Sequence, residues 1–157
     1  MREWDVLFEI ARVSASSTQL DELLDGVLAK DESHLRATLW KTYLTTDEAE
    51  PKKALAELGG LKEDLKKGAP TDYVLAELSR ARLLRRQGEA EAAADAVGNA
   101  ARAGATEPRL LALVAQAARA VGKLTRAQQA ASQAVSGAPS NLEYRKLLAE
   151  VQIERRD

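Results

Sequence analysis

Cysteine is absent from this chain of 157 residues, and histidine occurs once, as His34. Without cysteine the chain has no disulfide framework, no thiolate zinc site and no thiol nucleophile. No apolar run approaches the ~20 residues that a membrane-spanning helix requires. The start, Met-Arg-Glu-Trp-Asp, is too acidic for a signal peptide. We therefore expect a soluble, cytoplasmic protein.

Strand-forming residues are also scarce. Val, Ile, Phe, Trp and Tyr together number 17, whereas Ala and Leu together number 53. Ala and Leu favour helices, and the β-branched and aromatic residues are too few to build a sandwich or a barrel. The composition therefore predicts an all-α fold, and the length fits one domain or one domain with an appendage.

An internal repeat organises the second half of the chain. Gly88 and Gly122 lie 34 residues apart within two segments that align without a gap. Each segment is predicted to form a helix, a glycine turn and a second helix. Alanine at matching points lets paired helices approach to the short end of the ~8–10 Å range. The matched alanines are Ala81 with Ala115, Ala93 with Ala127, and Ala100 with Ala134.

These repeated positions resemble the tetratricopeptide repeat over roughly residues 70–157. The pattern of that family is a small residue midway along the first helix, a glycine before the turn, two alanines in the second helix and a proline at the exit. It is matched here by Ala115, Gly122, Ala127, Ala134 and Pro139. The resemblance implies a short right-handed α-solenoid of helical hairpins. Residues 71–157 are then two repeats followed by a capping helix, which Ser140 or Asn141 can cap at its start.

Residues 31–70 form a degenerate helical hairpin in this interpretation. Its helices are expected over residues 33–44 and roughly 47–67. Pro51 is tolerated only in the first turn of its helix, so that helix should begin between Asp47 and Glu50. Gly59-Gly60 is unfavourable inside a helix and indicates a break or a loosened turn.

Residues 1–30 are expected to form a pair of amphipathic helices. The stretch from Leu7 to Leu24 resembles the leading helices of GAF sensor domains, which often pack between two subunits. The resemblance implies an element suited to self-association, without the ligand pocket of that family. Covering an exposed leucine or valine contributes ~1.5–3 kcal/mol. The candidates for a dimer contact are Trp4, Phe8, Leu20, Leu24 and Leu28. The alternative is that this helix pair simply caps the first hairpin.

Catalytic chemistry finds little support in the sequence. His34 and Asp31 are spaced for one helix face, as a metal pair or an acid–base pair requires. A metal site needs further converging ligands, and there is no second histidine or cysteine to join them. Gly59-Gly60 lacks the following Lys-Ser or Lys-Thr of a phosphate-binding loop. We therefore expect no enzyme, no metal and no cofactor, with His34 solvated or capping a helix.

The charge is distributed unevenly along the chain. Residues 1–69 hold 10 Lys and Arg against 14 Asp and Glu, whereas residues 70–157 hold 13 against 10. In the tetratricopeptide family the first helix of each repeat lines the concave face. The positions that the resemblance turns inward are Arg82, Arg85, Arg86, Arg109, Gln116, Arg119, Glu143 and Lys146. Arginine recognises carboxylates in a planar, bidentate manner, so this row suits an acidic peptide or a C-terminal carboxylate.

Two interpretations of the arginine row remain open, a peptide-binding groove and a solvated helix face. The function that fits best is a non-catalytic adaptor for protein–protein interaction. A small secretion or assembly chaperone is the alternative, by analogy of layout. Nucleic acid is disfavoured because the basic surplus is small and only Tyr73 and Tyr144 are available for stacking in that half. A regulatory enzyme subunit lacks residues that would carry its chemistry.

Overall fold

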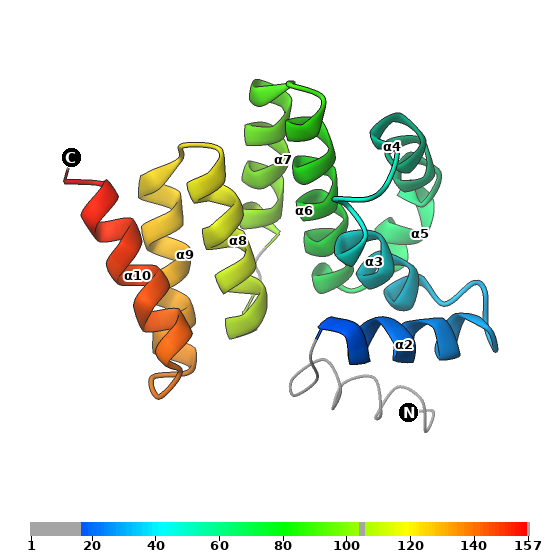
Figure 1. The fold of residues 1–157 in the computed structure, drawn as a ribbon, viewed down its shortest axis with the longest axis horizontal. Coiled ribbons are helices and arrows are strands. Elements are labelled where there is room, and N and C mark those ends of the chain that lie inside the picture. Colours follow the sequence, from blue (N-terminus) through cyan, green and yellow to red (C-terminus); the bar gives the residue numbers. More distant parts are fainter. Residues whose placement is uncertain (1–16, 104–105, 157) are drawn as a thin grey trace.

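The computed structural model describes residues 17–103 and 106–156. Within these ranges the chain forms nine helices and no strand, which confirms the predicted all-α fold (Figure 1). The helices are α2 (Ser17–Leu28), α3 (Leu35–Leu44), α4 (Pro51–Gly60), α5 (Lys62–Lys67), α6 (Pro70–Arg86), α7 (Ala90–Arg102), α8 (Pro108–Ala120), α9 (Leu124–Gly137) and α10 (Leu142–Glu154).

The helices stack as antiparallel hairpins in a solenoid. Helix α6 packs on α7, and α8 packs on α9, while α10 covers the end of the stack (Figure 1). The first helix of each hairpin contacts the next one along, from α3 to α6, from α6 to α8 and from α8 to α10. We call α3, α6, α8 and α10 the first-helix row. The second helices are α4, α7 and α9.

The two glycine turns have the same conformation. Gly88 has φ of 81° and Gly122 has φ of 72°, in the left-handed region that favours glycine. After the first turn, the Glu89 amide donates to the Leu84 carbonyl at 3.0 Å, and the Lys123 amide donates to the Ala118 carbonyl at 2.8 Å after the second. Both turns therefore close a helix with the same Schellman-type bond, 34 residues apart, as the repeat predicts.

Alanine fills the interface within each hairpin. The matched alanines of the repeat are at most 3% exposed, and the core between the helices also holds larger residues such as Leu78 and Val114. Small side chains at these points let the helix axes approach closely, which explains why alanine is so abundant here. The buried set is Ala81, Ala93, Ala100, Ala115, Ala127 and Ala134.

The helix boundaries before residue 70 follow from local backbone rules. Helix α4 begins at Pro51, one residue after the predicted range of Asp47 to Glu50, because Glu50 is the N-cap; the missing amide hydrogen of Pro51 removes no helical bond there, and the helix ends at Gly60. Helix α5 starts two residues later, so the break lies at Leu61, directly after the predicted Gly59-Gly60. His34 caps α3, because its Nδ1 accepts a hydrogen bond from the Ala37 amide at 3.2 Å. Asn141 caps α10 in the same manner, with bonds from the Glu143 and Tyr144 amides.

Helix α2 lies across the start of the stack and packs on α3 (Figure 1). Leu20 and Leu24 are 1% and 0% exposed, and Leu28 is half-buried against the core. Lys41 joins the two helices through ion pairs to Asp21 at 2.7 Å and Asp25 at 2.9 Å. Leu20, Leu24 and Leu28 are therefore packed against the core of the same chain. Trp4 and Phe8 lie outside the described residues. Self-association through these residues stays a prediction.

Candidate functional site

Two of the predicted groove arginines meet an aromatic pair on the first-helix row. The guanidinium carbon of Arg82 lies 4.7 Å from the Tyr43 ring centroid, and that of Arg109 lies 5.1 Å from the Trp40 centroid. The two rings pack edge to face, with centroids 6.2 Å apart. Both contacts are cation–π interactions, which hold the guanidinium planes over the rings. Helices α3, α6 and α8 thus converge on one cluster, which we call the arginine–aromatic cluster.

The Tyr43 hydroxyl within this cluster stays protonated at neutral pH. Burial raises its pKa, while the neighbouring cations Arg82 and Arg109 lower it and Asp47 raises it. The net shift is upward, so the phenol remains a neutral hydrogen-bonding group beside two cations. Arg82 also forms an ion pair within the chain, with its Nη2 4.0 Å from Oδ2 of Asp47.

Arg82 and Arg86 also fasten the connection between α3 and α4 to α6. Arg82 donates to the Tyr43 carbonyl oxygen at 3.2 Å, and Arg86 donates to the carbonyl oxygens of Thr46 and Ala49, each at 2.6 Å. Carbonyls that leave a helix end need donors from elsewhere in the chain. These two arginines supply them, so they have a structural task in addition to any role in binding.

Arg119 links α8 to α10. It donates to Glu150 at 2.6 Å and also pairs with Glu154. The hydrogen bond from Arg119 holds the pKa of Glu154 below its usual range and raises the pKa of Arg119 itself. This predicted first-helix position is thereby connected to the capping helix, and each of the three guanidinium nitrogens donates to Glu150 or Glu154.

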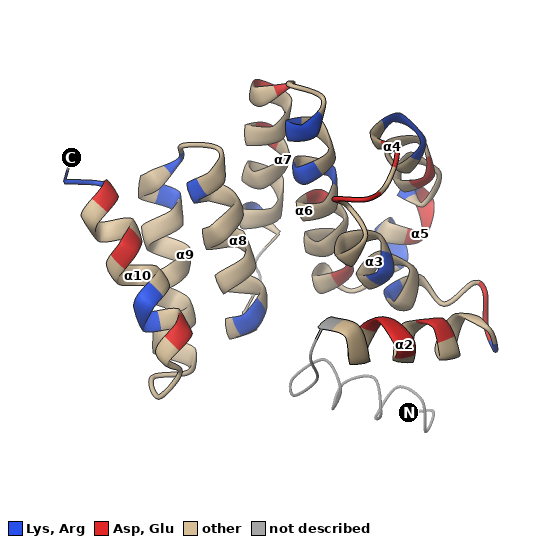
Figure 2. Cartoon of the chain, viewed as in Figure 1, with Lys and Arg blue, Asp and Glu red and all other residues tan. Residues whose placement is uncertain are grey.

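The remaining predicted groove residues, Arg85, Gln116 and Lys146, are exposed. Their side chains make no hydrogen bond or ion pair with any residue that the structure describes. The structure therefore brings Arg82 and Arg109 together and leaves the other three open on the same row of helices. Figure 2 shows that acidic residues lie along α2, whereas basic residues lie at the end of α6 that leads into α7. The assignment of a peptide groove to these residues stays a prediction.

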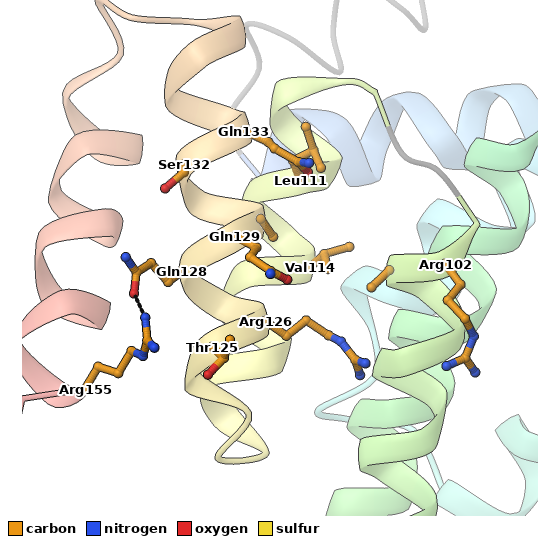
Figure 3. Close-up of a pocket in the computed structure, with 12 residues that line it drawn as sticks. Arg102, Leu111, Val114, Thr125, Arg126, Gln128, Gln129, Ser132, Gln133 and Arg155 are labelled. Carbon is orange, nitrogen blue, oxygen red and sulfur yellow. Dashed lines mark hydrogen bonds between the residues drawn. The ribbon is translucent and has the colours of Figure 1, made fainter.

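A groove that the sequence analysis missed lies on the side of the second helices. One hollow of about 860 Å³ is bordered by α7, α8, α9 and the end of α10 (Figure 3). Another of about 710 Å³ continues it between α7 and α9. Both are lined by Arg102, Thr125, Arg126 and Gln129. The one sequence signal for it was Gly98, a costly residue in an otherwise alanine-rich helix.

An apolar cleft of about 680 Å³ separates α4 and α5 from α6. Its walls include Leu55, Leu58 and Leu65 together with Tyr73, which is 37% exposed. Lys62, Lys66 and Arg80 also line it. Residues on both sides of the break between α4 and α5 contribute to its wall.

The described residues offer neither a metal-binding cluster nor a helix suited to a membrane. In residues 17–103 and 106–156, no three His, Asp or Glu side chains are grouped so that they would hold a metal ion. His34 is occupied as a helix cap. None of the described helices is long and apolar enough to cross a bilayer.

Solved structures with the same fold identify the architecture. The chain is similar to TTC0263, a thermophilic TPR protein of Thermus thermophilus, with a TM-score of 0.60, 17% identity, and coverage of 97% of this chain and 82% of that one. It is also similar to the MamA protein, with a TM-score of 0.51, 15% identity, and coverage of 94% and 78%. No family model matches the sequence, and no curated protein matches it. The fold is therefore that of tetratricopeptide-repeat proteins, which confirms the resemblance seen in the sequence.

Proposed function

We propose that this tetratricopeptide-like solenoid is a non-catalytic adaptor that binds an acidic segment, or a C-terminal carboxylate, of another protein along its first-helix row. The observation that carries the proposal is the arginine–aromatic cluster, in which Arg82 and Arg109 lie over Tyr43 and Trp40. Fold alone assigns no partner. The chemistry of this cluster is what favours an anionic ligand.

The cluster lowers the cost of binding in two ways. The rings hold two guanidinium groups in place, so little side-chain entropy is lost when a carboxylate pairs with them. Arg85, Gln116 and Lys146 are exposed on the same row of helices, where an extended ligand meets several of them in succession. Arginine and lysine at successive helices give an acidic segment several contacts, each of modest strength.

A chaperone is the second candidate function, and the apolar cleft between α4, α5 and α6 favours it. Leucine side chains and Tyr73 line a hollow of about 680 Å³ there, with basic residues beside them. Such a cleft accommodates apolar side chains of an amphipathic client helix whose acidic residues meet the lysines. In this candidate function, binding depends on Leu58 and Leu65 rather than on the arginines.

The experiment is affinity capture with the full chain, followed by titration of the identified partner segment against variants. Arg85→Glu and Arg109→Gln should each weaken that segment's binding, whereas Lys53→Glu, an exposed control on α4, should not. Far-UV circular dichroism checks that helix content is retained. A partner that binds both arginine variants as tightly as the parent refutes the adaptor proposal, and loss in Leu65→Ala instead favours the chaperone.

A further inference from the structure

Two arginines converge on a glycine in the middle of α7. A Cβ atom built at Gly98 would lie 3.0 Å from Nη1 of Arg126 and 3.5 Å from Nη1 of Arg102. Arg126 extends from α9 toward α7, and Arg102 follows Gly98 by one turn on α7 itself (Figure 3). The absent side chain of Gly98 therefore leaves room for the Arg126 guanidinium, and the Arg102 guanidinium lies at ordinary contact distance from the same point.

The two cations are not neutralised by carboxylates of the chain. Arg102 donates to the neutral amide oxygen of Asn99 at 2.6 Å, and Arg126 has no hydrogen bond or ion pair with any residue in the part of the chain that the structure describes. Two guanidinium groups brought this close repel each other, and an anion between them removes the repulsion. The pair is therefore arranged as an anion site.

The surroundings suit an oxyanion attached to a peptide. Thr125 and Gln129, which border both hollows, provide a hydroxyl and an amide beside the arginines. Leu111 and Val114 form an apolar wall in the larger hollow, and further amides of α9 follow it (Figure 3). A free small anion would use only the arginines, whereas an extended chain also fills the groove and hydrogen-bonds with the amides.

We propose that the groove between α7 and α9 is a second binding site, which takes a peptide carrying a phosphorylated serine or threonine, with the phosphoryl group between Arg102 and Arg126. A phosphate monoester carries a charge of about −1.5 to −2 at neutral pH, which matches two guanidinium groups better than the single charge of a carboxylate. The site lies on the second helices, so it is separate from the arginine–aromatic cluster and does not depend on the adaptor proposal.

Acidic residues set the direction of the peptide. Glu91 and Asp95 of α7 line the smaller hollow, whereas the larger hollow has Arg155 and no carboxylate among its lining residues. A ligand with a basic residue on one side of its phosphorylated residue is therefore accommodated with that basic side toward Glu91 and Asp95. Arg155 is held by a hydrogen bond to Gln128 at the opposite end (Figure 3).

The test is fluorescence anisotropy with the full chain and three probes. These are an end-blocked peptide with Arg-Ala-phosphoserine at its centre, the same peptide with plain serine, and inorganic phosphate as a competitor. We expect the phosphopeptide to bind, and Arg126→Gln and Arg102→Gln each to weaken it by roughly tenfold to a hundredfold. Lys53→Gln and Arg145→Gln are matched controls, because both residues are exposed and neither lines the two hollows, and they should bind as the parent does.

Gly98→Ala is a third variant that keeps the charges and fills the space. Alanine favours the helix, so folding is retained, yet its methyl group would lie 3.0 Å from Nη1 of Arg126 and displace that guanidinium. We expect weaker phosphopeptide binding with no loss of melting temperature. Equal affinity in Arg126→Gln and the parent overturns the proposal, and so does inorganic phosphate that competes as strongly as the phosphopeptide. Loss in Arg109→Gln alone overturns it too, and leaves the adaptor proposal standing.

Discussion

Replacement of Gly122 by alanine isolates the conformational cost of the repeat turn. Its φ of 72° lies in the left-handed region, and an added Cβ would have no other atom within 4 Å, so no steric contact contributes to the effect. A residue with a Cβ pays ~1–2 kcal/mol in that conformation. Reduced freedom of the unfolded chain offsets part of this. We expect a net loss of about 1 kcal/mol, which lowers the melting temperature by ~2–4 °C for a chain of this size.

Gly26→Ala is the matched control. Gly26 lies in α2, is exposed, has no positive φ, and has nothing within 4 Å of an added Cβ. Alanine should therefore stabilise the protein there by ~0.5–1 kcal/mol. Urea and thermal denaturation followed by circular dichroism measure both variants. Gly88→Ala should lose about as much as Gly122→Ala, and asparagine at either site should recover part of it. A Gly122→Ala protein as stable as the parent refutes the reasoning.

Three further predictions concern packing and charge. Gly137→Ala should cost ~1–3 kcal/mol of unfolding free energy despite alanine's helix propensity, because its Cβ would lie 2.6 Å from Cγ of the rigid Pro108 ring; unchanged urea denaturation would contradict this. Arg86→Ala should cost ~1–2 kcal/mol of unfolding free energy and speed amide exchange near Thr46, whose carbonyl loses its donor. Unaltered exchange would show that Arg86 does not hold the connection between α3 and α4. The Glu154 carboxyl should titrate below an ordinary glutamate, so its stabilising contribution is present at neutral pH and is lost as the pH falls through that lowered pKa. Arg119→Gln should return the midpoint measured by NMR to the ordinary range, and an unmoved midpoint would exclude Arg119 as the cause.

Features that depend on local backbone conformation and side-chain periodicity could be predicted from the sequence. Gly88 and Gly122 marked the turns because only glycine adopts their φ at low cost, and Pro51 marked a helix start because it lacks an amide hydrogen. The spacing of alanines predicted which faces pack, since a helix buries every third or fourth residue. These signals lie within a few residues of one another, so no tertiary information was needed to find them.

The partners of the charged residues depend on how the helices pack, and the sequence does not reveal them. Arg86 and the Thr46 carbonyl are 40 residues apart, and Arg119 and Glu150 are 31 apart, so periodicity carries no information about either contact. The sequence showed a row of equivalent arginines, whereas packing gives Arg82 and Arg86 loop carbonyls, Arg119 two glutamates, and Arg85 only solvent. In the sequence, Gly98 is distinguished only by its low helix propensity within α7. Its use becomes clear once α9 places Arg126 against it, because a guanidinium group needs the space that a side chain would fill.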